Sequence, residues 1–500
     1  MASFAFPDVW TWIHNLPPII QWKTESISLC ICPSCSSQPQ LKLAITKSLQ
    51  SYSSVTVSIL ADYNVPISLW ISKPFNLNFN NSTETISNLL LNFIEDVLNY
   101  CPNKNLSLFK RIPILDSNLN YKEMFNFSFL TLTFIICIYE APSDLRSGCL
   151  NILKNLFSCP QSRQVSKMLM RILGSNVEEQ WMRTINLAIT NWISEIKSEH
   201  HHHSLLLKSP SPLFSYSNPG FGFWKVQLYC PVIAMEVESS SSSHISAADD
   251  RLMFSLNYHQ LEGVIQLNYK VIVREKWIEV NVNTDNIRYD VISLVNETLM
   301  NERGAGITEK HFPSRISLHL TPTMQTNVLS VSVSKSSENP TREIGIEKGI
   351  EASIEPPNPF PGLNFSAGET MTMSLKPWKF EQWVHGNSIV LNWFLHDSVD
   401  GKEVFSSKPS KIALLQPKSW FKNRYSSAYR PFTREGGIIF AGDEYGDSVC
   451  WKVDKMALGK TMEWEIKGWI WLTYWPNKYR SLYSETRRAE FGELLQLTLA

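Results

Sequence analysis

The sequence has no net charge and no catalytic motif. Its 46 Lys and Arg residues balance 46 Asp and Glu residues, so a surface wholly committed to nucleic acid or to an anionic membrane is not expected. It contains no Gly-x-Ser-x-Gly elbow, no His-Glu-x-x-His helix and no Gly-x-x-x-x-Gly-Lys-Ser/Thr phosphate loop. These absences favour a protein that is not an enzyme over one that is, and no cofactor is expected.

Signals for export and for lipid attachment are missing as well. The first residues show no basic segment, no long apolar run and no Met-Gly start, so neither a secretory signal nor myristoylation is predicted. The nine cysteines are odd in number and scattered, which favours reduced thiols over a disulfide framework. Together these features predict an intracellular, cytoplasmic protein.

One apolar run, Phe125–Tyr139, is the candidate for a membrane span. It falls short of the roughly 20 residues that cross a bilayer, and it carries Asn126, Ser128 and two threonines. Its β-branched and aromatic residues are typical of a buried strand or a core helix. No membrane span is expected.

Three clusters have metal-ligand chemistry, and each is incomplete. They are Cys30, Cys32 and Cys35, the tract His200–His203, and Asp443, Glu444 and Asp447. The cysteines lack a fourth ligand nearby, the histidine tract has no ordered surroundings, and the acidic loop misses the spacing of a calcium loop. No metal site is expected.

The length of 500 residues exceeds what one hydrophobic core usually serves, so we expect two domains. Residues 1–200 show helical periodicity over 81–101, Ser143–Phe157, Ser162–Leu173 and Val177–Lys197. Leu41, Ile45 and Leu49 predict a further short helix, and Val55–Leu60 and Val65–Ile71 predict strands. Residues 1–200 are therefore predicted to be an α-rich domain with a few short strands.

Serine, histidine and proline dominate residues 201–220, which predicts a linker. Beyond it, alternating apolar residues recur with turn signals at short intervals, as in Leu261–Val273 and Val328–Ser334. Residues 221–500 are predicted to be a large antiparallel β domain resembling a sandwich. The expected fold class is α+β.

Glu463–Trp475 is the clearest strand in the sequence. Trp464, Ile466, Ile470, Leu472 and Tyr474 share one parity and predict a face that lies in the core. The opposite face carries Trp469, Trp471 and Trp475. Three exposed indoles would leave more apolar surface than a monomer normally shows, so this face is either covered by another layer of the chain or binds a ligand.

Lys418–Arg434 interleaves basic and aromatic residues without an acid. Its candidate binding residues are Trp420, Arg424, Tyr425, Tyr429, Arg430 and Arg434. Such a stretch could contact a phosphorylated partner or single-stranded nucleic acid. It could equally be a loop that packs its rings on the sandwich, stacking Arg424, Arg430, Arg487 or Arg488 on the indoles.

Several strings in the second half resemble an uncharacterised family of land-plant proteins. They are Leu375–Phe380, Leu391–Asp397, Ser407–Lys411, Pro417–Lys422, Tyr425–Arg434, Gly468–Lys478 and Glu485–Arg488. The resemblance covers the β-rich half best and implies no activity.

The sequence thus predicts a non-enzymatic intracellular binding or scaffold protein, possible partners being a protein, a carbohydrate or a small ligand. Two alternatives stay open. One is a sandwich that binds a carbohydrate or small ligand on the face of Trp469, Trp471 and Trp475. The other is a hydrolase that brings His396 and Asp397 together with distant groups.

Overall fold

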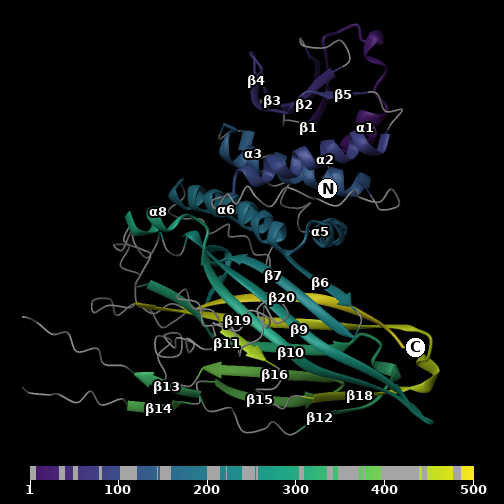
Figure 1. Cartoon of the computed structure of the whole chain (residues 1–500), viewed down its shortest axis with the longest axis vertical. Coiled ribbons are helices and arrows are strands. Elements are labelled where there is room, and N and C mark those ends of the chain that lie inside the picture. The colour runs from purple at the N-terminus through teal and green to yellow at the C-terminus, as the bar shows by residue number, and fades with distance from the viewer. Residues whose placement is uncertain are drawn as a thin grey trace, which may run out of the picture.

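The computed structural model describes residues 7–32, 40–48, 54–77, 82–101, 121–142, 145–146, 159–199, 214–220, 222–238, 254, 257–302, 309–334, 342–346, 371–375, 378–395, 438–441, 448–476 and 486–499. Helices with one small sheet form the first part, and long antiparallel strands form the second (Figure 1). The fold is α+β, as the sequence predicts.

A five-stranded antiparallel sheet begins the chain. Strands β1 (Ser26–Cys32), β2 (Gln40–Lys47), β3 (Ser54–Asp62) and β4 (Ile67–Ile71) lie in that order, and β5 (Phe75–Asn76) pairs with β3. Strand β2 corrects the helix predicted from Leu41, Ile45 and Leu49. Leu41, Leu43 and Ile45 are all buried, because a spacing of four residues also keeps side chains on one face of a strand.

Five helices follow or flank this sheet. They are α1 (Val9–His14), α2 (Ser82–Asn99), α3 (Tyr121–Tyr139), α5 (Pro160–Leu173) and α6 (Ser175–Glu199). The helices predicted from 81, 162 and 177 are confirmed, whereas most of Ser143–Phe157 lies outside the described residues. Gly174 separates α5 from α6 at φ 81°, a conformation that glycine adopts without steric cost.

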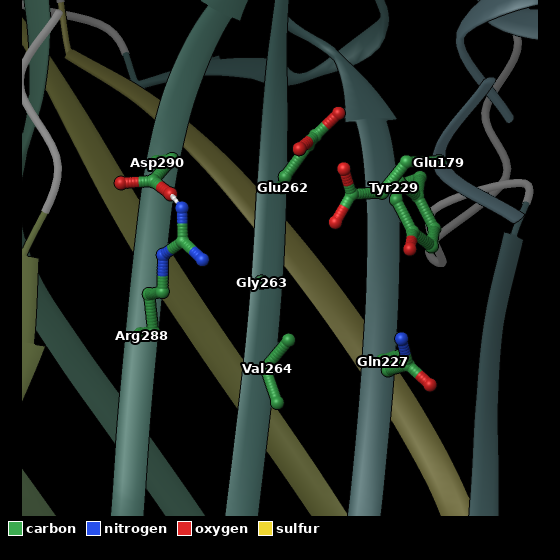
Figure 2. Close-up of a pocket in the computed structure, with 8 residues that line it drawn as sticks. All are labelled: Glu179, Gln227, Tyr229, Glu262, Gly263, Val264, Arg288 and Asp290. Atoms are coloured by element: carbon green, nitrogen blue, oxygen red, sulfur yellow. Dashed lines mark ion pairs between the residues drawn. The ribbon is translucent and has the colours of Figure 1, made fainter. Parts of the chain in front are cut away.

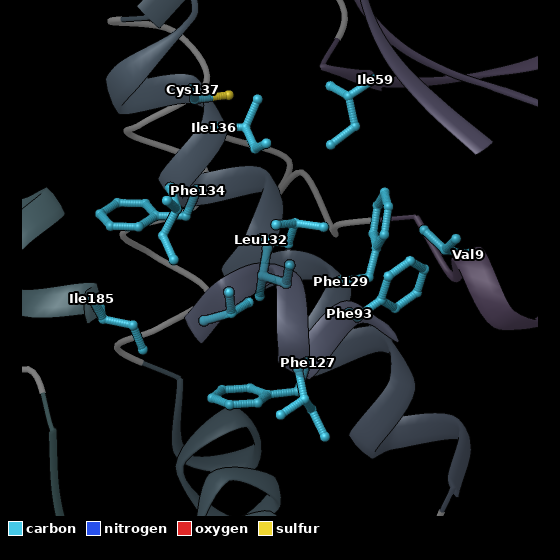
Figure 3. Packing of buried hydrophobic residues seen from close by; sticks show 14 of the residues in the cluster. Val9, Ile59, Phe93, Phe127, Phe129, Leu132, Phe134, Ile136, Cys137 and Ile185 are labelled. Carbon is cyan, nitrogen blue, oxygen red and sulfur yellow. The ribbon is translucent and has the colours of Figure 1, made fainter. Parts of the chain in front are cut away.

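Helix α3 is the centre of the first core (Figure 3). It is the one helix in the described part that is long and apolar enough to cross a membrane, yet 14 of its 19 residues are buried in the protein. Phe93 of α2 contacts Phe125 and Phe129 at ring separations of 5.0 and 5.5 Å. The apolar run found in the sequence is therefore a core helix, surrounded by apolar neighbours on all sides.

Two long sheets form the second part. The helix-facing sheet has the order β12-β18-β10-β9-β7-β6, and the far sheet has the order β15-β16-β11-β19-β20-β8. Helix-facing strands are β6 (Phe214–Gly220), β7 (Phe223–Pro231), β9 (His259–Val273), β10 (Trp277–Ser293), β12 (Val328–Val333) and β18 (Ser448–Asp454), with β17 (Ile438–Ala441) also on β10. Far-sheet strands are β8 (Glu236–Glu238), β11 (Glu309–Pro322), β15 (Trp378–His385), β16 (Ser388–Leu395), β19 (Thr461–Pro476) and β20 (Thr486–Thr498).

The inner faces of the two sheets share one core. Trp224, Trp451 and Trp464 are fully buried there, and the ring of Trp464 lies 5.6 Å from that of Trp224 and 6.1 Å from that of Trp451. Ile466, Ile470 and Leu472 of β19 lie in the same core, which confirms the predicted inward face of this strand. The two sheets also contact each other on both sides of this core. Ser217 of β6 donates to the Leu494 carbonyl of β20, and Gln382 of β15 donates to the Ser334 carbonyl after β12.

The predicted linker is shorter than expected. Residues 214–220 of the range 201–220 form β6, which pairs with β7 from Phe214↔Tyr229 to Gly220↔Phe223. Ser215 and Ser217 alternate with aromatic residues, so this serine-rich segment also has the period of a strand. The remainder, 201–213, lies outside the described residues, and the division into domains stays a prediction.

Candidate functional site

The most polar buried region lies where α6 covers the helix-facing sheet. Each of the three central strands turns apolar residues inward and polar residues towards the helix, as period-two alternation requires. Two cross-strand rows result, Tyr229–Glu262–Asp290 and Gln227–Val264–Arg288. Figure 2 shows these side chains projecting from β7, β9 and β10 on the same face of the sheet.

Helix α6 contributes the other half of the site. Glu179, Arg183 and Asn186 recur at helical spacing and so lie on one face. Arg183 donates to both oxygens of Glu262, Nε to Oε1 at 2.8 Å and Nη2 to Oε2 at 3.0 Å, which is the bidentate geometry of a strong ion pair. Asn186 Nδ2 donates to Gln260 Oε1 at 2.5 Å, so α6 is held on the sheet by polar contacts as well as apolar ones.

Glu178 is a buried acid at the contact of α6 with the sheet. It is buried, and its Oε1 accepts a hydrogen bond from the Tyr229 hydroxyl at 2.8 Å. Burial, helped by the nearby Glu179 and Glu262, raises the pKa of Glu178 to about 7 against the opposing effects of Tyr229 and Lys225. Burial also raises the pKa of Tyr229 well above its usual value. Glu178 therefore exchanges its proton near neutral pH.

Asp290 is a second titrating acid on the same face. Burial raises its pKa to about 6, although its ion pair with Arg288 acts in the opposite direction. Glu262 and Glu179 add a like-charge effect in the same direction as burial. Both acids therefore bind protons in mildly acidic to neutral solution.

A small hollow of about 310 Å³, open solvent included, lies among these groups. Its walls are Glu179, Gln227, Tyr229, Glu262, Gly263, Val264, Arg288 and Asp290 (Figure 2). Asn186 Oδ1 nearby is buried without a hydrogen-bond partner in the described part of the chain. No group of three or more His, Cys, Asp or Glu residues suited to a metal occurs among the described residues. The site can bind protons and, through its hollow, water.

The sequence did not identify this site. It placed Glu178 and Arg183 within the helix predicted over Val177–Lys197, and it gave Tyr229, Glu262 and Asp290 no role. The sequence indicates this site only through polar residues at the outward-facing positions of the long strands. Which helix would cover them could not be read from the strands themselves.

The residues that the sequence did propose lie elsewhere. Trp469 and Trp471 are half-buried on the outer face of the far sheet, and Trp475 lies at the end of β19, its side chain outside the described set. Trp420, Arg424, Tyr425, Tyr429, Arg430 and Arg434 lie outside the described residues.

A cation does stack on Trp471, but it is Arg315 of the neighbouring strand β11, whose Cζ lies 4.3 Å from the ring centroid. Arg488, one of the predicted candidates, instead pairs with Glu236 at 2.6 Å. Direct cross-strand register decides this, because Arg315 and Trp471 are opposite each other in the ladder.

No protein-family model matches the chain, and no curated protein matches it. Three solved structures that do match are Clostridium perfringens delta-toxin, a pore forming protein, and the Clostridium perfringens NetB toxin in its membrane-inserted form. Their identities are 9, 8 and 9%, and their TM-scores are 0.19, 0.20 and 0.16. The matches cover 56, 56 and 54% of this chain and 93, 91 and 94% of those chains.

These matches contradict the function predicted from the sequence. They are toxins and a pore forming protein, not intracellular scaffolds, ligand-binding sandwiches or hydrolases, and those three predictions are withdrawn. TM-scores of 0.16 to 0.20 carry no argument for giving this chain their activity. Membership of the land-plant family and a cytoplasmic location stay predictions.

Proposed function

We propose that this chain is a proton-responsive protein in which acidification tightens the contact between α6 and the helix-facing sheet. The observation that carries the proposal is the burial of the Glu178 carboxyl against the sheet, where it is 4% exposed and lies 2.8 Å from the Tyr229 hydroxyl. A carboxyl at such a position can be buried cheaply only when it is protonated.

The groups facing Glu178 come from every element packed around it. Those that act on it directly are Glu179 of α6, Lys225 and Tyr229 of β7, and Glu262 of β9. Arg183 of α6 and Asp290 of β10 belong to the same polar face through Glu262, which pairs with Arg183 and lies opposite Asp290. Arg183 is already paired with Glu262 and Arg288 with Asp290. Ionising Glu178 therefore adds a buried negative charge beside existing carboxylates.

The direction in which stability changes with pH follows from the raised pKa of Glu178. The folded protein holds a proton on Glu178 up to a pKa of about 7, against 4.5 for an unperturbed group. Stability from this group is therefore fully present below pH 4.5 and is lost as the pH rises through 7. The whole effect is on the order of 3 kcal/mol, since one unit is worth about 1.4 kcal/mol.

Hydrogen exchange across the two layers tests the proposal. After correction for intrinsic exchange rates, peptides of α6 are expected to be less protected at pH 8 than at pH 6, while peptides of β19 change little. Glu178→Gln, which cannot ionise, is expected to abolish most of that difference.

The matched control is Glu195→Gln, which lies on the same helix but pairs with Arg146. It is expected to keep the pH dependence of the wild-type protein. If α6 were protected equally at pH 6 and pH 8, or if Glu178→Gln behaved as the wild type does, acidification would not tighten this contact.

A further inference from the structure

The outer face of the far sheet carries a row of alternating aromatic and basic side chains. Phe394 of β16, Arg315 of β11, Trp471 of β19 and Arg488 of β20 are successive cross-strand partners. The Cζ atom of Arg315 lies 4.3 Å from the ring centroid of Trp471 and 4.9 Å from that of Phe394. Two rings therefore hold one guanidinium between them.

Arg315 differs from Arg488 of the same face in having no counter-ion in the part of the chain that the structure describes. Arg488 pairs with Glu236 at 2.6 Å. Arg315 makes no hydrogen bond or ion pair within the described residues, and its Nε is buried without an acceptor. A guanidinium that is stacked on its faces still offers its N–H groups at its edge, where planar anions bind.

Asn392 supplies the second half of a polar site. It lies opposite Ser317, two residues along from the Arg315–Phe394 pair and on the same face of the sheet. Its side chain is 2% exposed, and its Oδ1 has no hydrogen-bond partner among residues the structure describes. Diagonal neighbours of this kind lie roughly 7 to 8 Å apart, a gap that a small polar group can bridge.

We propose that Arg315 and Asn392 form a binding site for a phosphate group on the outer face of the far sheet. Arg315 would donate to two phosphate oxygens, and Asn392 would accept the proton of the third. Since the second ionisation of a phosphate ester occurs near pH 6, such a group still carries an O–H in mildly acidic solution. A carboxylate is the poorer ligand because it has no proton to give to Asn392 Oδ1.

The orientation of the Trp471 indole is fixed by a residue that lies outside the row of aromatic and basic side chains. Its Nε1 donates to Glu238 Oε1 at 2.5 Å, so the ring keeps one orientation against Arg315. The phosphate could belong to a soluble molecule or to a lipid headgroup, and both offer the same oxygens to the site.

Binding of phenyl phosphate at pH 6, measured by calorimetry, tests the site with a soluble probe. Flotation of vesicles of phosphatidylcholine with phosphatidic acid tests the lipid source. Arg315→Gln is expected to weaken whichever binding is seen at least tenfold. Arg315→Lys, which keeps the charge but not the planar fork, is expected to weaken it partially.

Arg488→Gln is the matched control, since that arginine is already paired, and it is expected to change binding less than threefold. Asn392→Ala is expected to reduce the preference for phenyl phosphate over benzoate. Binding to either phosphate source that depends on Arg315 supports the site and identifies the source. Equal binding by the wild type and both Arg315 variants in each assay, with their thermal unfolding unchanged, would overturn it.

Discussion

At the scale of single residues, the packing of the sandwich depends on which face of β19 each residue occupies. Trp464 points into the shared core and is fully buried, whereas Trp471 on the same strand is half-buried against Arg315. Gly468 lies between them and faces inward. It leaves the space that the ring of Phe491 on β20 occupies.

Gly468→Ala is expected to destabilise the protein by about 1 to 3 kcal/mol, as overpacking of a core does. A Cβ at this position would lie 2.1 Å from Cζ of Phe491, so the ring or the strand must move. The change is read from the midpoint of urea unfolding.

Gly492→Ala provides the comparison on the neighbouring strand. Its nearest contact would be Lys467 Cγ at 3.9 Å, an ordinary distance, so a change of less than about 0.5 kcal/mol is expected. Equal losses from the two substitutions would mean that strand propensity, not the ring of Phe491, sets the cost.

At the scale of elements, α6 is attached to β9 by one strong ion pair. The side chains of Arg183 and Glu262 are 21 and 12% exposed, so neither charge is well solvated by water. Removing one partner of such a pair leaves the other charge buried and alone.

Arg183→Ala is accordingly expected to lower the free energy of unfolding by about 3 to 5 kcal/mol. Adding Glu262→Gln to it is expected to restore part of that loss, because the stranded carboxylate is then gone. Chemical unfolding of the single and double variants measures both effects.

Arg274→Ala is the solvent-exposed counterpart. Arg274 pairs with Glu279, but its side chain is 53% exposed, so a loss below about 1 kcal/mol is expected. A similar loss from Arg183→Ala would show that the α6 contact is energetically a surface contact.

The elements themselves were largely predictable from the sequence, and their partners were not. Alternation in Leu261–Val273 and in Glu463–Trp475 fixed which residues face the core, because period two needs no knowledge of the neighbours. The helix predicted from Leu41 and Ile45 was wrong because their spacing fits both a helix and a strand. The site joining Glu178 to Tyr229 spans 51 residues, and no local pattern relates its two halves.

At the scale of the whole molecule, the boundary between the two parts is testable. The composition of residues 201–220 predicts the first cut in limited proteolysis, and β6 confines it to 201–213, since paired strands resist proteases. First cuts inside 261–285 or 461–475 would contradict the division into 1–200 and 221–500.

The two fragments are expected to remain together on gel filtration at pH 6. The contacts of α6 with β7 and β9, including the Arg183–Glu262 pair, do not depend on chain continuity. Separation at pH 6 would show that the linking segment, not the polar contact, joins the two parts.

The contact between β6 and β20 can form only after the ribosome has synthesised the chain as far as β20. Ser217 and its partner Leu494 are 277 residues apart, and at 5 to 20 residues per second a ribosome needs on the order of 14 to 55 s to travel between them. Throughout that interval β6 has no β20 beside it, and the core residues Phe491 and Leu495 have not yet been made. A nascent chain therefore displays an open sheet edge and an unfilled core for many seconds, which is the period in which a chaperone would be needed most.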